Sequence, residues 1–345
     1  MILFFSSPIG LGHATRDIAI LDKLKRIINN DILLVSGGAA SNLISNKGFS
    51  VLDLYKPNNF TVKSGELRYP FIWLMKYVSY YKKCKRIAET VINNNKETSN
   101  LIVSDEDFAS ISVSKRMNFA TRVLITDVTE THFTRGVFSI VERSMNKSMR
   151  KLIGTCDLVI IPCDGDDYEN VVHTGPIVRE SSAERDALRK KFALEKKTIL
   201  VSAGGTDAGR YLIEKSLVAF RNLRKRMDID LILVSGPSLK LDDDGDFRNT
   251  GFVDDLHEYI YASDLIISLA GKSTIDESII YGTPGIFIPI RNHFEQEENA
   301  KHLGFRYEDI LRLESIIEEK LYSPRVPSRK TNGAAKAAEL ISKFV

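Results

Sequence analysis

Short apolar runs alternate with stretches of helical periodicity along the first half of the chain. Ile2–Ser6 is an apolar run typical of a buried strand, and from Ala14 to Ile28 apolar residues recur every three or four positions, as in an amphipathic helix. Further strands are predicted at Asp31–Ser36, Val51–Leu54, Leu101–Ser104, Thr121–Asp127 and Leu158–Pro162, the last of this half, with helices at Asn42–Lys47, Tyr69–Asn94 (one helix or a pair) and Phe108–Met117. This βα rhythm predicts a parallel, doubly wound sheet.

The same rhythm restarts after a polar crossing at His173–Glu184. A strand at Lys197–Ser202, a glycine turn at Ala203–Asp207 and a helix from Ala208 to Met227 repeat the device that opens the chain. Further strands are predicted at Leu231–Ser235, Thr250–Val253, Leu265–Leu269 and Gly285–Pro289. The fold class is therefore α/β, with two Rossmann-like domains at residues 1–176 and 177–330. Residues 331–345 form a C-terminal helix that is expected to pack back on the first domain.

Composition and charge exclude several classes of protein. The chain has 345 residues, of which 43% are hydrophobic and 27% charged, as in an ordinary globular protein. A net charge of +3 is too small to indicate nucleic-acid binding. The three cysteines form no metal-ligand pattern, and no apolar run approaches the length of a membrane span. Without a recognisable signal peptide, the expected location is cytoplasmic.

The segment from Tyr69 to Asn94 has an unusual composition, because aromatic side chains are interleaved with Lys and Arg. Between Lys63 and Asn100 there are eight Lys and Arg against three Glu. One interpretation is an amphipathic helix whose aromatic residues pack in the core. The other is a partly exposed apolar patch, ringed by cations, that contacts an anionic membrane. The sequence leaves both open.

The strand–turn–helix from Leu265 to Pro284 predicts a phosphate site. The strand ends at Ala270-Gly271, and the following helix begins with small residues and carries Glu277 about one turn in. Free backbone N–H groups and the positive end of the helix dipole would meet there. The alternative is an ordinary βα turn.

Three ordered pieces of the second half resemble the donor domain of glycosyltransferases with the GT-B fold. They are Ala203-Gly-Gly-Thr-Asp-Ala-Gly209, then Gly251-Phe-Val-Asp-Asp-Leu256 with Gly271 and Glu277 beyond it, and His293-Phe-Glu-Gln-Glu-Glu-Asn-Ala300. The nearest likeness is to the lipid-intermediate N-acetylglucosaminyltransferases of peptidoglycan synthesis, which belong to glycosyltransferase family 28. In the first half, Ile9-Gly-Leu-Gly-His13 resembles the glycine-rich acceptor-side loop of the same superfamily.

This resemblance implies a UDP-sugar donor and a role for particular residues. Phe252 and Val253 would border the uracil, and Glu277 would bind the ribose hydroxyls. The diphosphate would lie against Gly204, Gly205, Thr206, Gly271, Ser273 and Thr274. Glu295 and Gln296 match the pair that contacts the donor sugar, but the family usually has a Gln pair or Asp-Gln there. The identity of the donor sugar, N-acetylglucosamine or another hexose, is therefore left open. Lys272 and Ser273 replace small apolar residues of the family, but this changes the expected phosphate site little.

Sugar transfer with inversion requires a base that deprotonates the acceptor hydroxyl, and His13 is the candidate. It follows the acceptor-side loop that contains Gly10 and Gly12, with Arg16 one turn further on. A carboxylate should orient the imidazole, and Asp105 directly follows a predicted strand. Glu106 and Asp107 are equally available, and the three acids could instead cap the next helix. Arg16, His132 and Arg135 are candidate acceptor contacts.

We expect no cofactor and no obligatory metal. Asp164-Gly-Asp166-Asp167 contains the DxD spelling of metal-dependent transferases with another fold, but its polar surroundings favour a solvated loop, as they do for Asp242–Asp244. The resemblance implies an inverting transfer to a hydroxyl acceptor, which is polyprenyl-linked in many members, at the inner membrane face. Alternatives are a nucleotide-sugar hydrolase, a 2-epimerase whose carboxylates are not found, or a catalytically silent sugar-nucleotide-binding protein.

Overall fold

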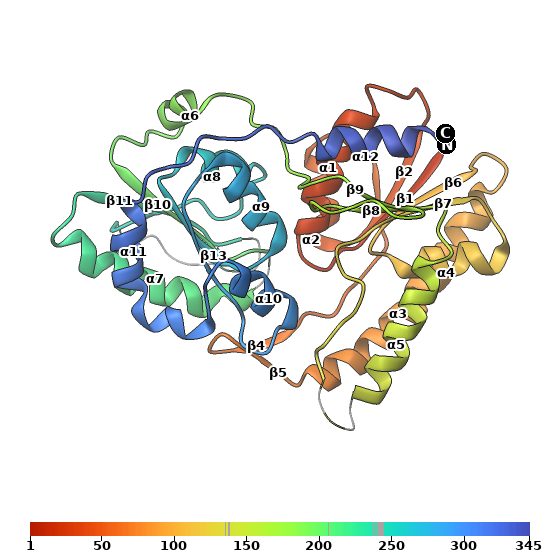
Figure 1. Cartoon of the computed structure of the whole chain (residues 1–345), viewed down its shortest axis with the longest axis horizontal. Coiled ribbons are helices and arrows are strands. Elements are labelled where there is room, and N and C mark those ends of the chain that lie inside the picture. The colour runs from red at the N-terminus through yellow and green to blue at the C-terminus, as the bar shows by residue number, and fades with distance from the viewer. Residues whose placement is uncertain (135, 137–138, 206, 237–238, 240–244) are drawn as a thin grey trace. The chain divides into compact units, whose positions relative to one another are not determined.

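The computed structural model describes residues 1–134, 136, 139–205, 207–236, 239 and 245–345. The chain divides into two compact units (Figure 1). The first contains Met1–Asn59, Tyr69–Arg179 and Thr331–Val345, and the second contains Phe60–Arg68 and Glu180–Lys330. In each unit a parallel sheet is flanked by helices, and the structure bears out the α/β class and the two Rossmann-like sheets.

The first unit is built on seven parallel strands in the order β3-β2-β1-β6-β7-β8-β9. Their bounds are β1 Ile2–Ser6, β2 Ile32–Ser36, β3 Val51–Asp53, β6 Leu101–Asp105, β7 Thr121–Ile125, β8 Leu158–Ile161 and β9 Val171–His173. The helices are α1 Gly12–Leu24, α2 Gly38–Asn46, α3 Pro70–Asn95, α4 Phe108–Met117, α5 Ser139–Ile153 and α12 Gly333–Ser342, which packs on α1. The strand order reverses between β1 and β6, so the chain leaves these adjacent strands toward opposite sides.

The segment from Tyr69 to Asn94, for which the sequence left one helix or a pair open, is one long helix, α3. One prediction for the first unit is corrected. The strand at 158–162 is not the last of this half, because β9 pairs in parallel with β8 and brings His173 into the sheet. With three residues at the sheet edge, β9 is too short to stand out from the polar loop before it.

The second unit has five parallel strands in the order β12-β11-β10-β13-β14. Their bounds are β10 Lys197–Ser202, β11 Ile229–Val234, β12 Arg248–Asn249, β13 Leu265–Leu269 and β14 Gly285–Ile288. The helices are α6 Arg185–Lys191, α7 Arg210–Arg224, α8 Leu256–Ala262, α9 Lys272–Tyr281, α10 Phe294–His302 and α11 Leu313–Leu321, with short 3-10 turns at η2 Asp207–Gly209 and η3 Tyr307–Arg312. The strand predicted at 250–253 is wrong. Gly251 has a φ of +66° and its N–H bonds to the Asn249 side chain at 3.0 Å, which turns the chain after β12.

A hairpin from the first half of the sequence belongs to the second unit. Its strands, β4 Thr61–Lys63 and β5 Glu66–Arg68, are antiparallel. The Leu67 N–H donates to the carbonyl of Arg291 at 2.9 Å, and the Arg291 N–H donates to the carbonyl of Gly65 at 2.9 Å. The sequence did not predict this segment, because its partners lie more than 200 residues away.

Candidate functional site

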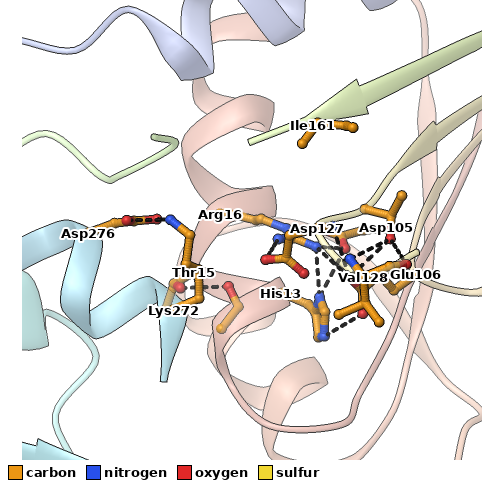
Figure 2. A network of polar contacts seen from close by, with 12 residues as sticks. His13, Thr15, Arg16, Asp105, Glu106, Asp127, Val128, Ile161, Lys272 and Asp276 are labelled. Atoms are coloured by element: carbon orange, nitrogen blue, oxygen red, sulfur yellow. Dashed lines mark hydrogen bonds and ion pairs between the residues drawn. The ribbon is translucent and has the colours of Figure 1, made fainter. Parts of the chain in front are cut away.

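In the first unit, His13, Arg16 and Asp105 form a buried polar cluster (Figure 2). Nδ1 of His13 lies 2.9 Å from Oδ1 of Asp105. The Arg16 guanidinium holds the same carboxylate with two nitrogens, Nε to Oδ2 at 2.6 Å and an Nη to Oδ1 at 2.5 Å. Its other Nη bonds to Asp127 at 3.0 Å. Asp105 is fully buried, so this carboxylate is satisfied by cations and not by solvent.

The local fold explains why these residues meet. Asp105 is the last residue of β6, and His13 and Arg16 lie in the first turns of α1, which follows the adjacent strand β1. Positions three apart share one helix face, so both side chains reach the end of β6. The loop between β1 and α1 contains Gly10, with a φ of +80°, and Gly12 is the first residue of α1. The structure thus brings together the predicted pair His13 and Asp105, and it gives Arg16 carboxylate partners that the sequence did not predict.

The charges of the cluster set its protonation. Burial disfavours an ionised carboxyl at Asp105, but Arg16 and His13 outweigh it and hold the pKa of Asp105 below its usual range. Burial likewise disfavours the imidazolium of His13, yet the charges of Asp105 and Glu106 raise its pKa to about 9. An ionised carboxylate only accepts hydrogen bonds, so Asp105 selects the form of His13 that carries a proton on Nδ1.

Three further carboxyl groups surround this cluster; the sequence offered Glu106 as an alternative partner of His13 but did not assign the other two to it. Glu106 lies beside Nε2 of His13, Asp127 follows β7 at the same sheet edge as Asp105, and Asp17 accepts a bond from the Ser6 hydroxyl at 2.5 Å. Asp127 could have been expected, because β7 is the next parallel strand. The capping alternative holds for Asp107, whose side chain accepts from the Ser110 N–H at the start of α4.

A small pocket adjoins the cluster within the first unit. It is lined by the loop residues Ser7, Pro8 and Ile9, by Tyr77, Tyr80, Tyr81 and Cys84 of α3, and by Glu106 and Asp107. The acceptor-side loop therefore faces aromatic side chains of α3. Of the other candidate acceptor contacts, His132 is exposed, and Arg135 lies outside the described residues.

In the second unit, the predicted donor residues follow the carboxyl ends of the parallel strands. Gly204 and Gly205 follow β10, and Gly204 has a φ of +77°. A Cβ on Gly236, after β11, would lie 2.3 Å from the carbonyl oxygen of Gly204, so the two loops are in close contact. Since β10 and β13 are adjacent where the strand order reverses, these loops surround the point at which doubly wound sheets bind ligands. Thr206 lies outside the described residues.

The predicted phosphate site is at the N-terminus of α9. Gly271 is the N-cap and no side chain caps this end, while Ser273 and Thr274 lie in the first turn, half-buried. The Lys272 ammonium bonds to Asp276 at 2.5 Å, one turn along. Glu277 is 4% exposed, so its carboxyl group is held inside the unit. The arrangement supplies backbone N–H groups and a helix dipole to an anion.

The remaining donor candidates frame the same sheet edge. Phe252 and Val253 are half-buried in the irregular segment after β12. Glu295 and Gln296 lie in the first turn of α10, and the side-chain oxygen of Gln296 accepts from the Ile290 N–H at 3.1 Å. The Asn299 amide of the same helix donates to the carbonyl of Ala270, next to Gly271, at 3.1 Å. The helix with the predicted sugar contacts is thus bonded to the predicted phosphate turn.

The sequence predicts that two acidic loops are solvated and hold no metal. Asp164, Asp166 and Asp167 are exposed, and Asp167 accepts from the His173 N–H at 2.7 Å, whereas Asp242–Asp244 lies outside the described residues. Within the described ranges, no group of three or more His, Cys, Asp and Glu is placed to hold a metal ion. None of the helices described is long and apolar enough to cross a membrane.

The second unit is similar to a domain of known proteins. Residues 198–325 match the model of the glycosyltransferase family 28 C-terminal domain. A relative described as an uncharacterized glycosyltransferase, from Methanopyrus kandleri, is 28% identical over 58% of this chain and 64% of its own length. The UDP-N-acetylglucosamine–N-acetylmuramyl-(pentapeptide) pyrophosphoryl-undecaprenol N-acetylglucosamine transferase of Caldicellulosiruptor saccharolyticus is 24% identical over 96% of this chain and 94% of its own length.

Solved structures agree on the fold. The glycosyltransferase of kitacinnamycin superposes with a TM-score of 0.64 over 100% of this chain and 98% of that one, at 14% identity. So low an identity supports the fold alone.

Proposed function

We propose that this chain, a glycosyltransferase of the GT-B fold with a family 28 C-terminal domain, transfers a sugar from a UDP-sugar to an acceptor hydroxyl with inversion. The observation that carries the proposal is the match over residues 198–325, which includes both glycine turns after β10 and β13. The C. saccharolyticus relative is named as a transferase for UDP-N-acetylglucosamine and a pyrophosphoryl-undecaprenol acceptor. UDP-N-acetylglucosamine is therefore the first donor to test on this chain, and a polyprenyl-linked compound is the first acceptor.

We assign the base to His13. In the reactive form, Nδ1–H of His13 donates to Asp105 and the lone pair on Nε2 takes the proton of the acceptor hydroxyl. The acceptor oxygen then bonds to the anomeric carbon, and the bond from that carbon to the diphosphate breaks. The leaving diphosphate is stabilised by the backbone N–H groups at Gly271, Ser273 and Thr274. No step requires a cofactor or an obligatory metal.

With a pKa of about 9, most of the His13 imidazole holds a proton at neutral pH in the resting protein. Only the smaller neutral fraction can act as a base. We therefore expect kcat/KM to rise with pH up to about 9. This also makes His13 a stronger base in its neutral form than an ordinary histidine.

We further propose that α3 contacts a membrane that holds the acceptor. Its exposed face begins with apolar side chains at Tyr69, Ile72 and Met75, of which Ile72 is 52% and Met75 48% exposed. The same face continues with exposed cations at Lys76, Lys82, Lys83 and Arg86. Apolar side chains next to Lys and Arg are the pattern of a surface that binds anionic lipid.

The burial of individual side chains limits which residues of α3 could contact a membrane. Trp73 is 9% exposed, its indole N–H donates to the carbonyl of Asn58 at 3.0 Å, and its ring stacks on Tyr77. Trp73 is therefore a core residue, and the exposed patch consists of its helical neighbours. The core interpretation of this segment therefore holds for one face of the helix, and the membrane contact is our proposal for the other face.

The test is UDP release from a panel of UDP-sugars, measured with and without a polyprenyl-lipid extract. The proposal expects release that depends on both UDP-N-acetylglucosamine, or another hexose donor, and the lipid acceptor. Equal release without any acceptor would indicate a nucleotide-sugar hydrolase instead. Donor binding without turnover on any acceptor would indicate a silent binding protein.

A further inference from the structure

The two ring nitrogens of His13 face different carboxyl groups (Figure 2). Nδ1 lies 2.9 Å from Asp105, while Nε2 lies 3.6 Å from Oε2 of Glu106. The first is a hydrogen-bond distance, and the second is slightly longer than one. Nε2 is the nitrogen that takes the proton in the reaction proposed above, so Glu106 stands beside the atom that becomes protonated.

The backbone places Glu106 there at a cost. Its φ is +50°, a left-handed conformation that is strained for a residue other than glycine. The Glu106 N–H donates to the carbonyl of Ile125 at 3.1 Å, which fixes this turn at the end of β6. Oε1 then accepts from the Thr126 hydroxyl and the Asp127 N–H, both at 3.2 Å. With Oε1 held in this way, Oε2 is directed toward His13.

We propose that Glu106 is a positioning residue for the same reaction, in which its carboxylate stabilises the imidazolium that His13 becomes when it takes the acceptor's proton. This rests on the proposed function. The acceptor O–H bond breaks and an Nε2–H bond forms, while the Nδ1–H of His13 keeps its hydrogen bond to Asp105. The new positive charge then lies between two carboxylates, one at each ring nitrogen, and the Nε2 proton is later released to solvent. The His13 side chain is 16% exposed, which gives that proton an exit.

The charged groups around Glu106 come from three elements. His13 and Arg16 face it from α1 and Asp127 from the end of β7, while Asp105 precedes it at the end of β6. Burial and the Asp127 charge raise the pKa of Glu106 to about 8, and burial also raises the pKa of Asp17. Arg16 outweighs burial at Asp127 and lowers the pKa of that carboxyl to about 2. His13 and Glu106 therefore titrate as an interacting pair between about pH 8 and pH 9.

The experiment is a titration of the His13 ring by NMR in the substrate-free protein, comparing the wild type with Glu106→Gln. Glutamine keeps the shape of the side chain and removes the charge, so we expect the pKa of His13 to fall by at least one pH unit. Glu106→Asp, which keeps a charge on a shorter arm, should give an intermediate fall. The matched control is Glu89→Gln, which removes an exposed carboxylate paired with Arg116 on α4 and should leave His13 unchanged. An unchanged His13 in both Glu106 variants would overturn the proposal.

The pH profile of kcat/KM separates a role in the reaction from a structural one. Its acidic limb, along which kcat/KM rises with pH, should move to lower pH in Glu106→Gln by the same interval as the NMR pKa, with a plateau at least tenfold lower because the imidazolium is less stable. A limb that stays in place would overturn the proposal even if the NMR pKa moved. Because the titration needs no substrate, failure to find any transferase activity would count against the proposed function and would not be confused with a failure of Glu106 to act on His13.

Discussion

Replacing Asp105 by Asn should destabilise the first unit, and the unfolding of that unit can be followed by the fluorescence of Trp73. The fully buried Asp105 carboxylate accepts from two Arg16 nitrogens at 2.5 and 2.6 Å and from His13 at 2.9 Å. Asparagine keeps one acceptor oxygen for these three donors and turns an N–H₂ group toward them. Removing one partner of a buried ion pair costs about 3–5 kcal/mol, and we take the lower end, about 3 kcal/mol, because Arg16 keeps its bond to Asp127.

For a unit of this size, about 3 kcal/mol lowers the midpoint of thermal unfolding by about 6–12 °C. Trp73, the single tryptophan of the chain, is packed in the first unit, so its fluorescence reports the unfolding of that unit. Glu89→Gln is the control, because an exposed ion pair contributes less than about 1 kcal/mol. A midpoint for Asp105→Asn within 2 °C of the wild type would refute the reasoning, since the carboxylate would then carry no structural charge.

Three further predictions concern pH, the donor loops and the membrane. The pKa values of His13 and Glu106 are raised on folding, from 6.5 to about 9 and from 4.5 to about 8, so both groups bind protons more tightly in the folded state. Their stabilising contribution is complete at low pH and is lost as pH rises through 8 and 9. The free energy of unfolding from urea titrations should therefore fall between pH 6.5 and 9, and it should fall less in the double variant His13→Gln/Glu106→Gln. A flat wild-type curve would contradict this. Gly236→Ala should weaken UDP binding in calorimetry at least tenfold, because its Cβ would meet the Gly204 carbonyl at 2.3 Å, whereas Gly245→Ala, with a similar φ and no atom within 4 Å, should bind UDP as the wild type does. The double variant Ile72→Ser/Met75→Ser should bind anionic vesicles at least tenfold more weakly in sedimentation, because it removes two apolar anchors of about 1.5–3 kcal/mol each. Val218→Ser, on the exposed surface of α7, should bind vesicles as the wild type does. Equal vesicle binding by both variants would remove α3 from the membrane contact.

The strands that could be predicted from the sequence are the long apolar ones. The bounds of β1, β10 and β13 are those expected, because a buried parallel strand is apolar along its whole length and ends at a glycine or a polar turn. The sequence also named Asp105 as one of three acids that could orient His13, and in the structure the two side chains meet because adjacent parallel strands end at the same sheet edge. In contrast, the β4–β5 hairpin depends on Arg291, and no local pattern records a partner so distant.

The roles of Asp105, Glu106 and Asp107 could not be separated from the sequence for a different reason. The three acids Asp105–Asp107 follow one strand, and each could orient His13 or cap α4. In the structure Asp107 caps the helix, Asp105 holds Nδ1, and Glu106 reaches Nε2 only through its left-handed backbone. That conformation is a property of the folded turn and leaves no signature in the residue type, because glutamate is not a residue that favours it.

The measurement that tests the central claim most directly is the turnover of His13→Ala beside its affinity for UDP. The account predicts that kcat falls by at least a hundredfold at pH 8, because the acceptor hydroxyl loses its base, while UDP binding measured by calorimetry stays within twofold of the wild type. A kcat within a few-fold of the wild-type value would contradict the account, because the acceptor's proton would then be taken by another group.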